Sequence, residues 1–244
     1  MSEEAEGADN RRMKAIFVLT ATLAFVTSPL WSSGFGGFDP NAYPNPQIDP
    51  PIQPAGYAFS VWSVIYLWLL FSAGYGLFSR ADDPAWDRVR WPLTISLVVG
   101  APWISVAVIS PVWATVMIWV MLISALWALF AAPAQDRWLC AAPIALYAGW
   151  LSAASFVALG LLGAGYGVIA GETGWAWAML LAALALGTAV QKNLAWMPIY
   201  SVGIVWALIA VAVRNWPGDP ALAMLSVFGA GWLAWSALRG MRRT

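Results

Sequence analysis

The side chains of this sequence that can bind another molecule are mainly aromatic. Trp62 and Tyr66 are four residues apart, and Tyr147 and Trp150 are three apart, so each pair lies on one face of a helix. Aromatic faces of this kind, with a few hydroxyl groups, can form the walls of a site for a flat hydrophobic ligand. The ligand would be held by stacking and one or two hydrogen bonds. The same rings can instead only pack helices together, with glycine and alanine allowing close approach. The spacing leaves both interpretations open.

Residue types that usually support catalysis or bind metals are scarce. Histidine is absent, which removes the usual haem ligand, the commonest metal ligand and any Ser-His or Cys-His pair. The single cysteine, Cys140, is expected to be a small packing residue. Glu172, Asp39 and Asp49 are the acidic candidates outside the membrane, and surface charge explains them. We therefore expect no enzyme, no required cofactor and no metal site.

Composition indicates that the helices carrying these rings lie in lipid. The chain has 244 residues, 61% hydrophobic and only 10% charged, with a mean hydropathy of +0.70. Soluble domains are nearer to about 25% charged. Because backbone polar groups must be satisfied internally in lipid, the sequence predicts an all-α, polytopic transmembrane helical bundle. The zero net charge gives no sign of a nucleic-acid partner.

Long apolar runs predict about eight transmembrane helices. The runs are 14–33, 57–79, 92–110, 111–133, 139–163, 175–191, 194–213 and 220–238. The sixth run is short, and we expect it to be tilted or partly re-entrant. Residues 1–13 are expected to form an acidic cytoplasmic tail.

The basic residues give the expected orientation. With eight spans, every Lys and Arg except Arg214 falls on one side of the membrane, which the positive-inside rule makes cytoplasmic. Both termini are then cytoplasmic. No Asp, Glu, Lys or Arg lies centrally in any span, which argues against a proton-driven pump or a channel for charged solutes.

The longest expected loop, residues 34–56, lies on the opposite side. It contains six prolines and no Lys or Arg, so it cannot be one helix. It is either a disordered bridge or a proline-stiffened lid over a cavity that opens on this face. A ligand-binding bundle predicts a closed aromatic cavity of roughly 300–1,000 Å³ beneath it.

Three segments resemble motifs of the TspO/MBR family, the tryptophan-rich sensory proteins related to the mitochondrial translocator protein. Residues 54–66 (PAGYAFSVWSVIY) resemble its signature at the start of the second helix, with one residue fewer between Phe59 and Trp62. Residues 147–154 resemble its Tyr-x-x-Trp-x-x-x-Ala motif, and Trp103 its Asn-x-x-Trp motif. Gly100 and Ala158 stand where the family motifs carry asparagine.

The resemblance implies a five-helix TspO-like bundle over residues 14–163 and a C-terminal three-helix extension over 164–244. It implies a protein that senses or carries a tetrapyrrole, sterol-like or carotenoid-like ligand, and a porphyrin is the candidate ligand. The protein would thereby regulate pigment metabolism. Trp62 and Trp150 would form aromatic walls, and Tyr66 and Tyr147 would donate hydrogen bonds. The implied ligand-binding residues are Pro54, Tyr57, Phe59, Trp62, Tyr66, Trp103, Tyr147 and Trp150.

The alternative is a non-catalytic accessory subunit that docks on a larger, pigment-binding membrane complex. Small residues of the last three helices would supply the docking face: Gly187, Gly203, Gly229 and Gly231. The expected surroundings are the lipid bilayer of a bacterial inner membrane and a hydrophobic small molecule. A homodimer and a membrane-complex partner both stay open.

Overall fold

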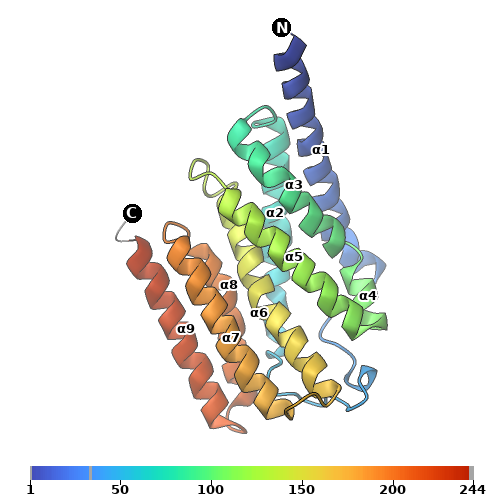
Figure 1. The fold of residues 1–244 in the computed structure, drawn as a ribbon, viewed down its shortest axis with the longest axis vertical. Coiled ribbons are helices and arrows are strands. Elements are labelled where there is room, and N and C mark those ends of the chain that lie inside the picture. The colour runs from blue at the N-terminus through green and yellow to red at the C-terminus, as the bar shows by residue number, and fades with distance from the viewer. Residues whose placement is uncertain (1, 33–34, 242–244) are drawn as a thin grey trace.

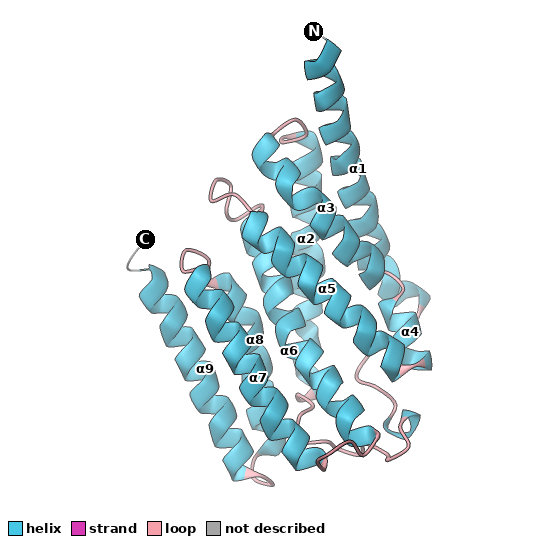
Figure 2. Ribbon diagram, in the orientation of Figure 1, coloured by secondary structure: helices cyan, strands magenta, loops and turns pink. Residues whose placement is uncertain are grey.

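The computed structural model describes residues 2–32 and 35–241, and the regular secondary structure of these residues is entirely helical (Figures 1 and 2). Two short 3-10 helices, Pro40–Ala42 and Gly56–Ser60, accompany nine α-helices. The α-helices are α1 (Ser2–Trp31), α2 (Val61–Phe78), α3 (Pro84–Gly100), α4 (Trp103–Ile109), α5 (Pro111–Ala131), α6 (Ala141–Gly165), α7 (Glu172–Asn193), α8 (Ile199–Asn215) and α9 (Pro220–Met241). The predicted all-α bundle is confirmed.

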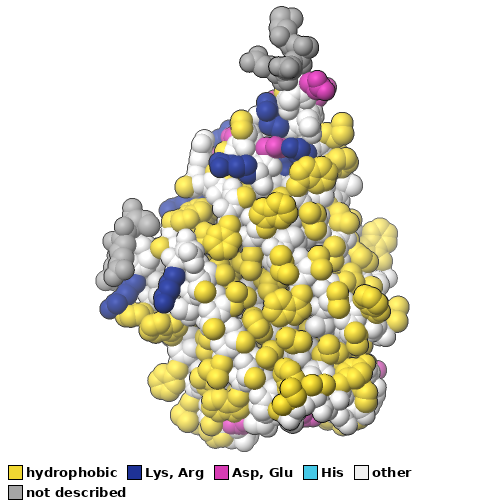
Figure 3. All heavy atoms as spheres, in the orientation of Figure 1, with side chains coloured by type: hydrophobic (Ala, Val, Ile, Leu, Met, Phe, Trp, Pro, Cys, Tyr) yellow, Lys and Arg dark blue, Asp and Glu magenta, His cyan; other side chains and the backbone are white. Residues whose placement is uncertain are grey.

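The bundle is built to cross a membrane repeatedly. Seven segments are long and apolar enough to span, and α3 and α4 together form one of them. The remaining helix, α8, has 17 residues, or roughly 26 Å at 1.5 Å per residue. Since α1 begins and α9 ends at the same end of the bundle, the crossings are even in number, and α8 supplies the eighth (Figure 1). Hydrophobic side chains cover most of the face between the two ends (Figure 3).

Several helix boundaries differ from those expected, including the start of α8 at Ile199 and the break between α3 and α4 within the expected run 92–110. The first helix runs back to Ser2, so the expected acidic tail is helical in its described part. The third crossing begins at Pro84 because the Asp83 carboxylate accepts a hydrogen bond from the Ala85 amide at 2.8 Å and proline suits a first helical turn. The sixth crossing, α7, has a full 22 residues, so the short helix is α8, the seventh crossing.

The centre of the bundle is α6, which packs against α2, α5, α7 and α8. Its approach to α8 is especially close. A Cβ atom at Gly149 would collide with the carbonyl oxygen of Tyr200, and one at Gly203 would collide with the main chain of Gly149 and Trp150. The C-terminal helices are therefore part of the wall around α6.

The loop over residues 35–55 is packed onto α6 and α8 at the end of the bundle away from the termini (Figure 1). Two main-chain hydrogen bonds fix it, from the Asn45 amide to the Gly165 carbonyl at 2.8 Å and from the Ala55 amide to the Ala210 carbonyl at 3.1 Å. The Asn215 side chain adds a third, to the Pro51 carbonyl at 2.8 Å. The described part of this loop is thus a tethered lid rather than a disordered bridge.

Candidate functional site

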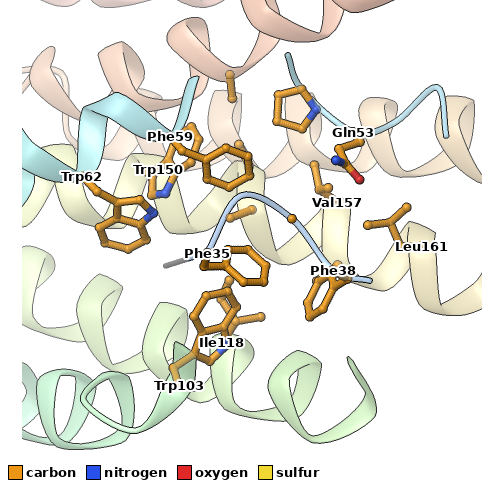
Figure 4. Close-up of a pocket in the computed structure, with 16 residues that line it drawn as sticks. Phe35, Phe38, Gln53, Phe59, Trp62, Trp103, Ile118, Trp150, Val157 and Leu161 are labelled. Carbon is orange, nitrogen blue, oxygen red and sulfur yellow. The ribbon is translucent and has the colours of Figure 1, made fainter. Parts of the chain in front are cut away.

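Two cavities lie beneath the lid, where the sequence predicted one. The smaller has a volume of about 50 Å³ and is bounded by the lid, α5, α6 and α8 (Figure 4). The larger has a volume of about 340 Å³ and lies among α1, α2, α3, α4 and α5. The larger falls within the expected range for a small-molecule site, roughly 300–1,000 Å³, whereas the smaller holds only a few water molecules.

Four aromatic side chains separate the two cavities and line both of them: Phe35, Phe59, Trp62 and Trp103. Phe35, from the lid, lies with its ring centroid 4.8 Å from that of Trp103 and 5.9 Å from that of Phe59, each in an edge-to-face arrangement (Figure 4). The indole N–H of Trp103 donates to the Ala114 carbonyl at 2.9 Å, which fixes this ring. Phe35 is the member of the wall that comes from a loop.

The second helix contributes the predicted stack. The rings of Trp62 and Tyr66 are 5.3 Å apart at an interplanar angle of 23°. Phe25 of α1 meets them edge-on, 5.8 Å from Trp62 and 5.2 Å from Tyr66. A Cβ atom at Gly100 would lie 2.7 Å from the Phe25 ring, so glycine at this motif position leaves space for Phe25. The contact between Gly100 and the Phe25 ring therefore occupies the side of the cavity where the family motif carries an asparagine.

Trp150 of α6 lines the small cavity, and its indole N–H is an unused hydrogen-bond donor. Its side chain is buried, and the indole nitrogen has no partner among the described residues. Its ring is 6.2 Å from Trp62 and 6.1 Å from Phe59, edge-to-face in both pairs. Because an unpaired buried donor costs about 1–3 kcal/mol, a ligand with an acceptor atom at this point would recover that free energy.

Tyr147 lies beside this region without lining either cavity. It is fully buried, and its hydroxyl is 2.9 Å from the Ser96 hydroxyl. Ser96 donates its one hydrogen to the Met121 carbonyl at 2.8 Å, so Tyr147 must be the donor in the tyrosine–serine pair. The hydroxyl expected to donate to a ligand is thus already used to join α6 to α3.

Tyr57 also lies outside both cavities. It belongs to the 3-10 helix Gly56–Ser60 and packs against Trp206 of α8 with ring centroids 5.5 Å apart. The Trp206 indole donates to the Ala58 carbonyl at 2.9 Å, which ties this turn to α8. The other six motif residues line one or both cavities: Pro54, Phe59, Trp62, Tyr66, Trp103 and Trp150.

Sequence reasoning missed three aromatic side chains of the site. Phe25 is on α1, and Phe35 and Phe38 come from the lid. The signal for the last two was present, since two phenylalanines stand in the glycine-rich stretch of residues 34–38, an unusual place for large apolar rings. Phe38 in turn packs on the buried lid residue Tyr43, with ring centroids 6.4 Å apart.

Tyr43 is a buried side chain that anchors the lid to the end of α6. A Cβ atom at Gly165, the end of α6, would collide with the Tyr43 side chain, so glycine is required for this contact. Burial raises the pKa of the Tyr43 hydroxyl well above its usual range, and the nearby Tyr166 adds to the rise.

The linings of both cavities contain no charged side chain, and their polar groups are the Gln53 amide, hydroxyls and indoles. No group of three or more His, Cys, Asp or Glu residues within the described chain is placed to hold a metal ion. The arrangement can stack a flat apolar molecule and donate a hydrogen bond to it.

The family model described as TSPO-like protein matches residues 14–239. The chain belongs to the TSPO-like family. The match extends beyond residue 163, where the motif resemblance ends, and covers α7, α8 and nearly all of α9. No curated protein and no solved structure matches this TSPO-like chain. The family and the apolar helices together establish a multi-pass membrane protein.

Proposed function

We propose that this TSPO-like protein binds a flat, hydrophobic molecule between its lid and its aromatic wall and acts as a sensor or carrier for it, without catalysing a reaction. The observation that carries this proposal is the unpartnered indole N–H of Trp150, a residue that lines an aromatic cavity without charged side chains. A site of this kind selects ring systems with a carbonyl or carboxylate oxygen. Tetrapyrroles, sterol-like and carotenoid-like molecules are the ligand classes that we propose.

Ligand size requires the wall between the cavities to move. A tetrapyrrole does not fit in the 50 Å³ cavity beside Trp150. Phe35 is the wall residue borne by the lid, and its displacement would join this cavity to the 340 Å³ cavity. A large ligand would then contact Trp62 on the way to Trp150. Binding and lid movement are therefore coupled in this proposal.

The test is titration of the protein in mild detergent with protoporphyrin IX, followed by the shift of the porphyrin absorbance band and by quenching of tryptophan fluorescence. We expect saturable binding that weakens in Trp62→Phe/Trp150→Phe. The matched control is Trp113→Phe/Trp127→Phe, which changes two exposed rings of α5. Equal weakening in both double variants, or no saturation in the wild type, would overturn the proposal.

The basic end of the bundle gives the proposed orientation. Arg80 binds Asp136, Arg90 donates to the Arg11 carbonyl, and both α1 and α9 have their terminal ends on this side (Figure 1). We propose that this end faces the cytoplasm of a bacterial inner membrane, by the positive-inside rule. Protease cleavage of an added C-terminal tag in sealed vesicles of known orientation tests it.

The accessory-subunit alternative loses its expected docking face. Gly203 packs on α6, a Cβ atom at Gly187 would meet Ile204, and one at Gly229 would meet Leu184 on α7. Of the four glycines proposed for docking, only Gly231 has open space around its Cβ position. The other three glycines serve packing within the chain.

A further inference from the structure

The basic end of the bundle is electrically asymmetric. In the C-terminal half, the described basic side chains at this end are exposed and form no ion pair: Arg137, Lys192 and Arg239. Arg242 and Arg243 add to this charge in the sequence but lie outside the described residues. Beyond Asp136, the only acidic residues are Glu172, at the start of α7, and Asp219, before α9, both at the opposite end.

The N-terminal half of the same end is balanced by contrast. Lys14 pairs with Asp87 at 2.8 Å, and Arg80 pairs with Asp136 at 2.7 Å. Asp136 is therefore already engaged by the N-terminal half, although it directly precedes Arg137. In Figure 3, dark blue side chains near the C-terminal end have no magenta neighbour in that view. The excess positive charge is confined to one side of the bundle.

A small pocket lies within this unbalanced region. Its volume is about 60 Å³, and it opens between the α5–α6 connection, the α7–α8 turn and the end of α9. Its lining is Arg137, Trp138, Trp196, Met197, Pro198, Ile199 and Met241. The lining combines one cationic side chain with six apolar or aromatic side chains, so the pocket has a charged side and an apolar side.

The elements around the pocket are held firmly. A Cβ atom at Gly240 would lie 2.8 Å from the Ala195 carbonyl oxygen, which shows how closely α9 approaches the α7–α8 turn. The Ser201 hydroxyl donates to the Gln191 side chain at 2.6 Å, and the Gln191 amide donates to the Leu194 carbonyl at 3.0 Å. The turn is therefore fixed on both sides before any ligand arrives.

The Arg137 guanidinium is positioned without being neutralised. Its central carbon lies 5.3 Å from the ring centroid of Trp138, a cation–π contact that leaves its N–H groups available. A guanidinium presents a planar fork of donors that matches phosphate oxygens. Tryptophan rings such as Trp138 and Trp196 favour the headgroup depth of a bilayer, where phosphates lie.

We propose that this pocket binds the phosphate of an anionic phospholipid headgroup, with Arg137 as the direct contact and Lys192 and Arg239 supplying the surrounding positive potential. The volume suits a compact phosphate group, and the apolar lining from Trp196 to Ile199 lies against the glycerol backbone and the first acyl carbons. Uncompensated cations at the headgroup level make an anionic lipid, rather than a zwitterionic one, the complementary occupant.

Native mass spectrometry of the full chain in mild detergent tests this proposal. Phosphatidylglycerol and phosphatidylcholine of identical acyl chains are titrated separately into wild type, Arg137→Gln and Arg88→Gln. Arg88 is the matched control because it is an exposed arginine at the balanced side of the same end, with no ion pair among the described residues. A third arm adds excess inorganic phosphate.

We expect wild type to retain phosphatidylglycerol over phosphatidylcholine, and Arg137→Gln to lose about fivefold in apparent affinity, the effect of removing one basic contact at a membrane surface. Arg88→Gln keeps the wild-type affinity. Equal retention of both lipids, or equal loss in the two variants, would show diffuse attraction and overturn the site. Displacement of the lipid by inorganic phosphate would show that the pocket takes a free anion instead. Monodisperse elution of both variants controls for folding.

Discussion

Gly203 of α8 lies directly against the main chain of Trp150 on α6. A Cβ atom at Gly203 would also come within 2.9 Å of the Leu146 carbonyl oxygen, so no larger side chain fits without moving a helix. The helix that carries the proposed hydrogen-bond donor is therefore positioned by a helix far along the sequence. This contact makes α8 part of the site.

Gly203→Ala is expected to destabilise the protein by about 1–3 kcal/mol, because overpacking between two main chains forces them apart. Gly231→Ala is the matched control, since its Cβ would meet open space within α9, and helical alanine is favoured over glycine by about 0.5–1 kcal/mol. Apparent unfolding temperatures in detergent should fall for the first variant and hold or rise for the second. Equal temperatures for both would contradict the close approach.

Phe35→Ala should tighten the binding of protoporphyrin IX severalfold, because the ligand no longer has to displace a ring from the wall between the cavities. Ile48→Ala, an exposed residue of the same lid, is the control. Absorbance titration measures both. Weaker binding in Phe35→Ala would mean that this ring is a contact of the bound ligand rather than a barrier to it.

Asn215→Ala should loosen the lid. The Asn215 side chain bonds both the Val211 carbonyl of its own helix and the Pro51 carbonyl of the lid, each at 2.8 Å. Asn193→Ala is closely matched, since the Asn193 side chain bonds only a carbonyl four residues back in its own helix.

Hydrogen exchange of the Ala55 amide, which bonds the Ala210 carbonyl, reports on lid opening. Loss of one lid bond worth about 1 kcal/mol predicts roughly fivefold faster exchange in Asn215→Ala. The Asn193 variant should exchange at the wild-type rate. Unchanged exchange in both would show that Asn215 does not hold the lid.

Asp136→Asn should remove a pH-dependent contribution to stability. Hydrogen bonds from Arg80, and then from Trp86, hold the pKa of the Asp136 carboxyl below its usual range. A lowered folded-state pKa stabilises the protein above the unfolded pKa of about 4, and this contribution is lost as the pH falls through the folded value.

Apparent unfolding temperatures measured from pH 7 down to about 3 should therefore differ more between wild type and Asp136→Asn at neutral pH than at the acidic end. Asp82→Asn, an exposed carboxylate without an ion pair among the described residues, is the control. A pH-independent difference would mean that Asp136 acts through packing alone.

Cys140 should resist alkylation in the folded protein. It is fully buried, and burial raises the pKa of its thiol to about 12, so the reactive thiolate is scarce at pH 8. Maleimide labelling of wild type should be slow in detergent and complete after denaturation. Rapid labelling under native conditions would show that the start of α6 opens readily.

The sequence predicted the helical bundle because long apolar runs and segregated charges are local signals. It also predicted the Trp62–Tyr66 stack, since i,i+4 spacing on a helix brings two rings together whatever the surroundings. Helix ends were less predictable: α3 starts at Pro84 because of a cap at Asp83, within a stretch whose charges resemble a loop.

Tyr57 shows why part of the site was not predictable. The position of Tyr57 in the family motif, rather than helical spacing, indicated it, since five residues back from Trp62 is about 140° around an α-helix. Residues 56–60 instead form a 3-10 helix, with a different rotation per residue. Tyr57 consequently meets Trp206. The role of Phe25 depended on long-range packing against Gly100, which no local pattern specifies.

The bonds between the lid and α8 couple the position of the lid to the position of this helix. Asp49 pairs with Arg214, and the Pro51 and Ala55 main chains bond to the same helix, so any molecule that lifts the lid must do work on α8. Because such coupling is reciprocal, a contact that stabilises one position of α8 changes the affinity of the proposed cavity for its ligand by the same free energy. In the proposed function, ligand binding beneath the lid is thereby coupled to α8, a helix of 17 residues that runs toward the opposite end of the bundle.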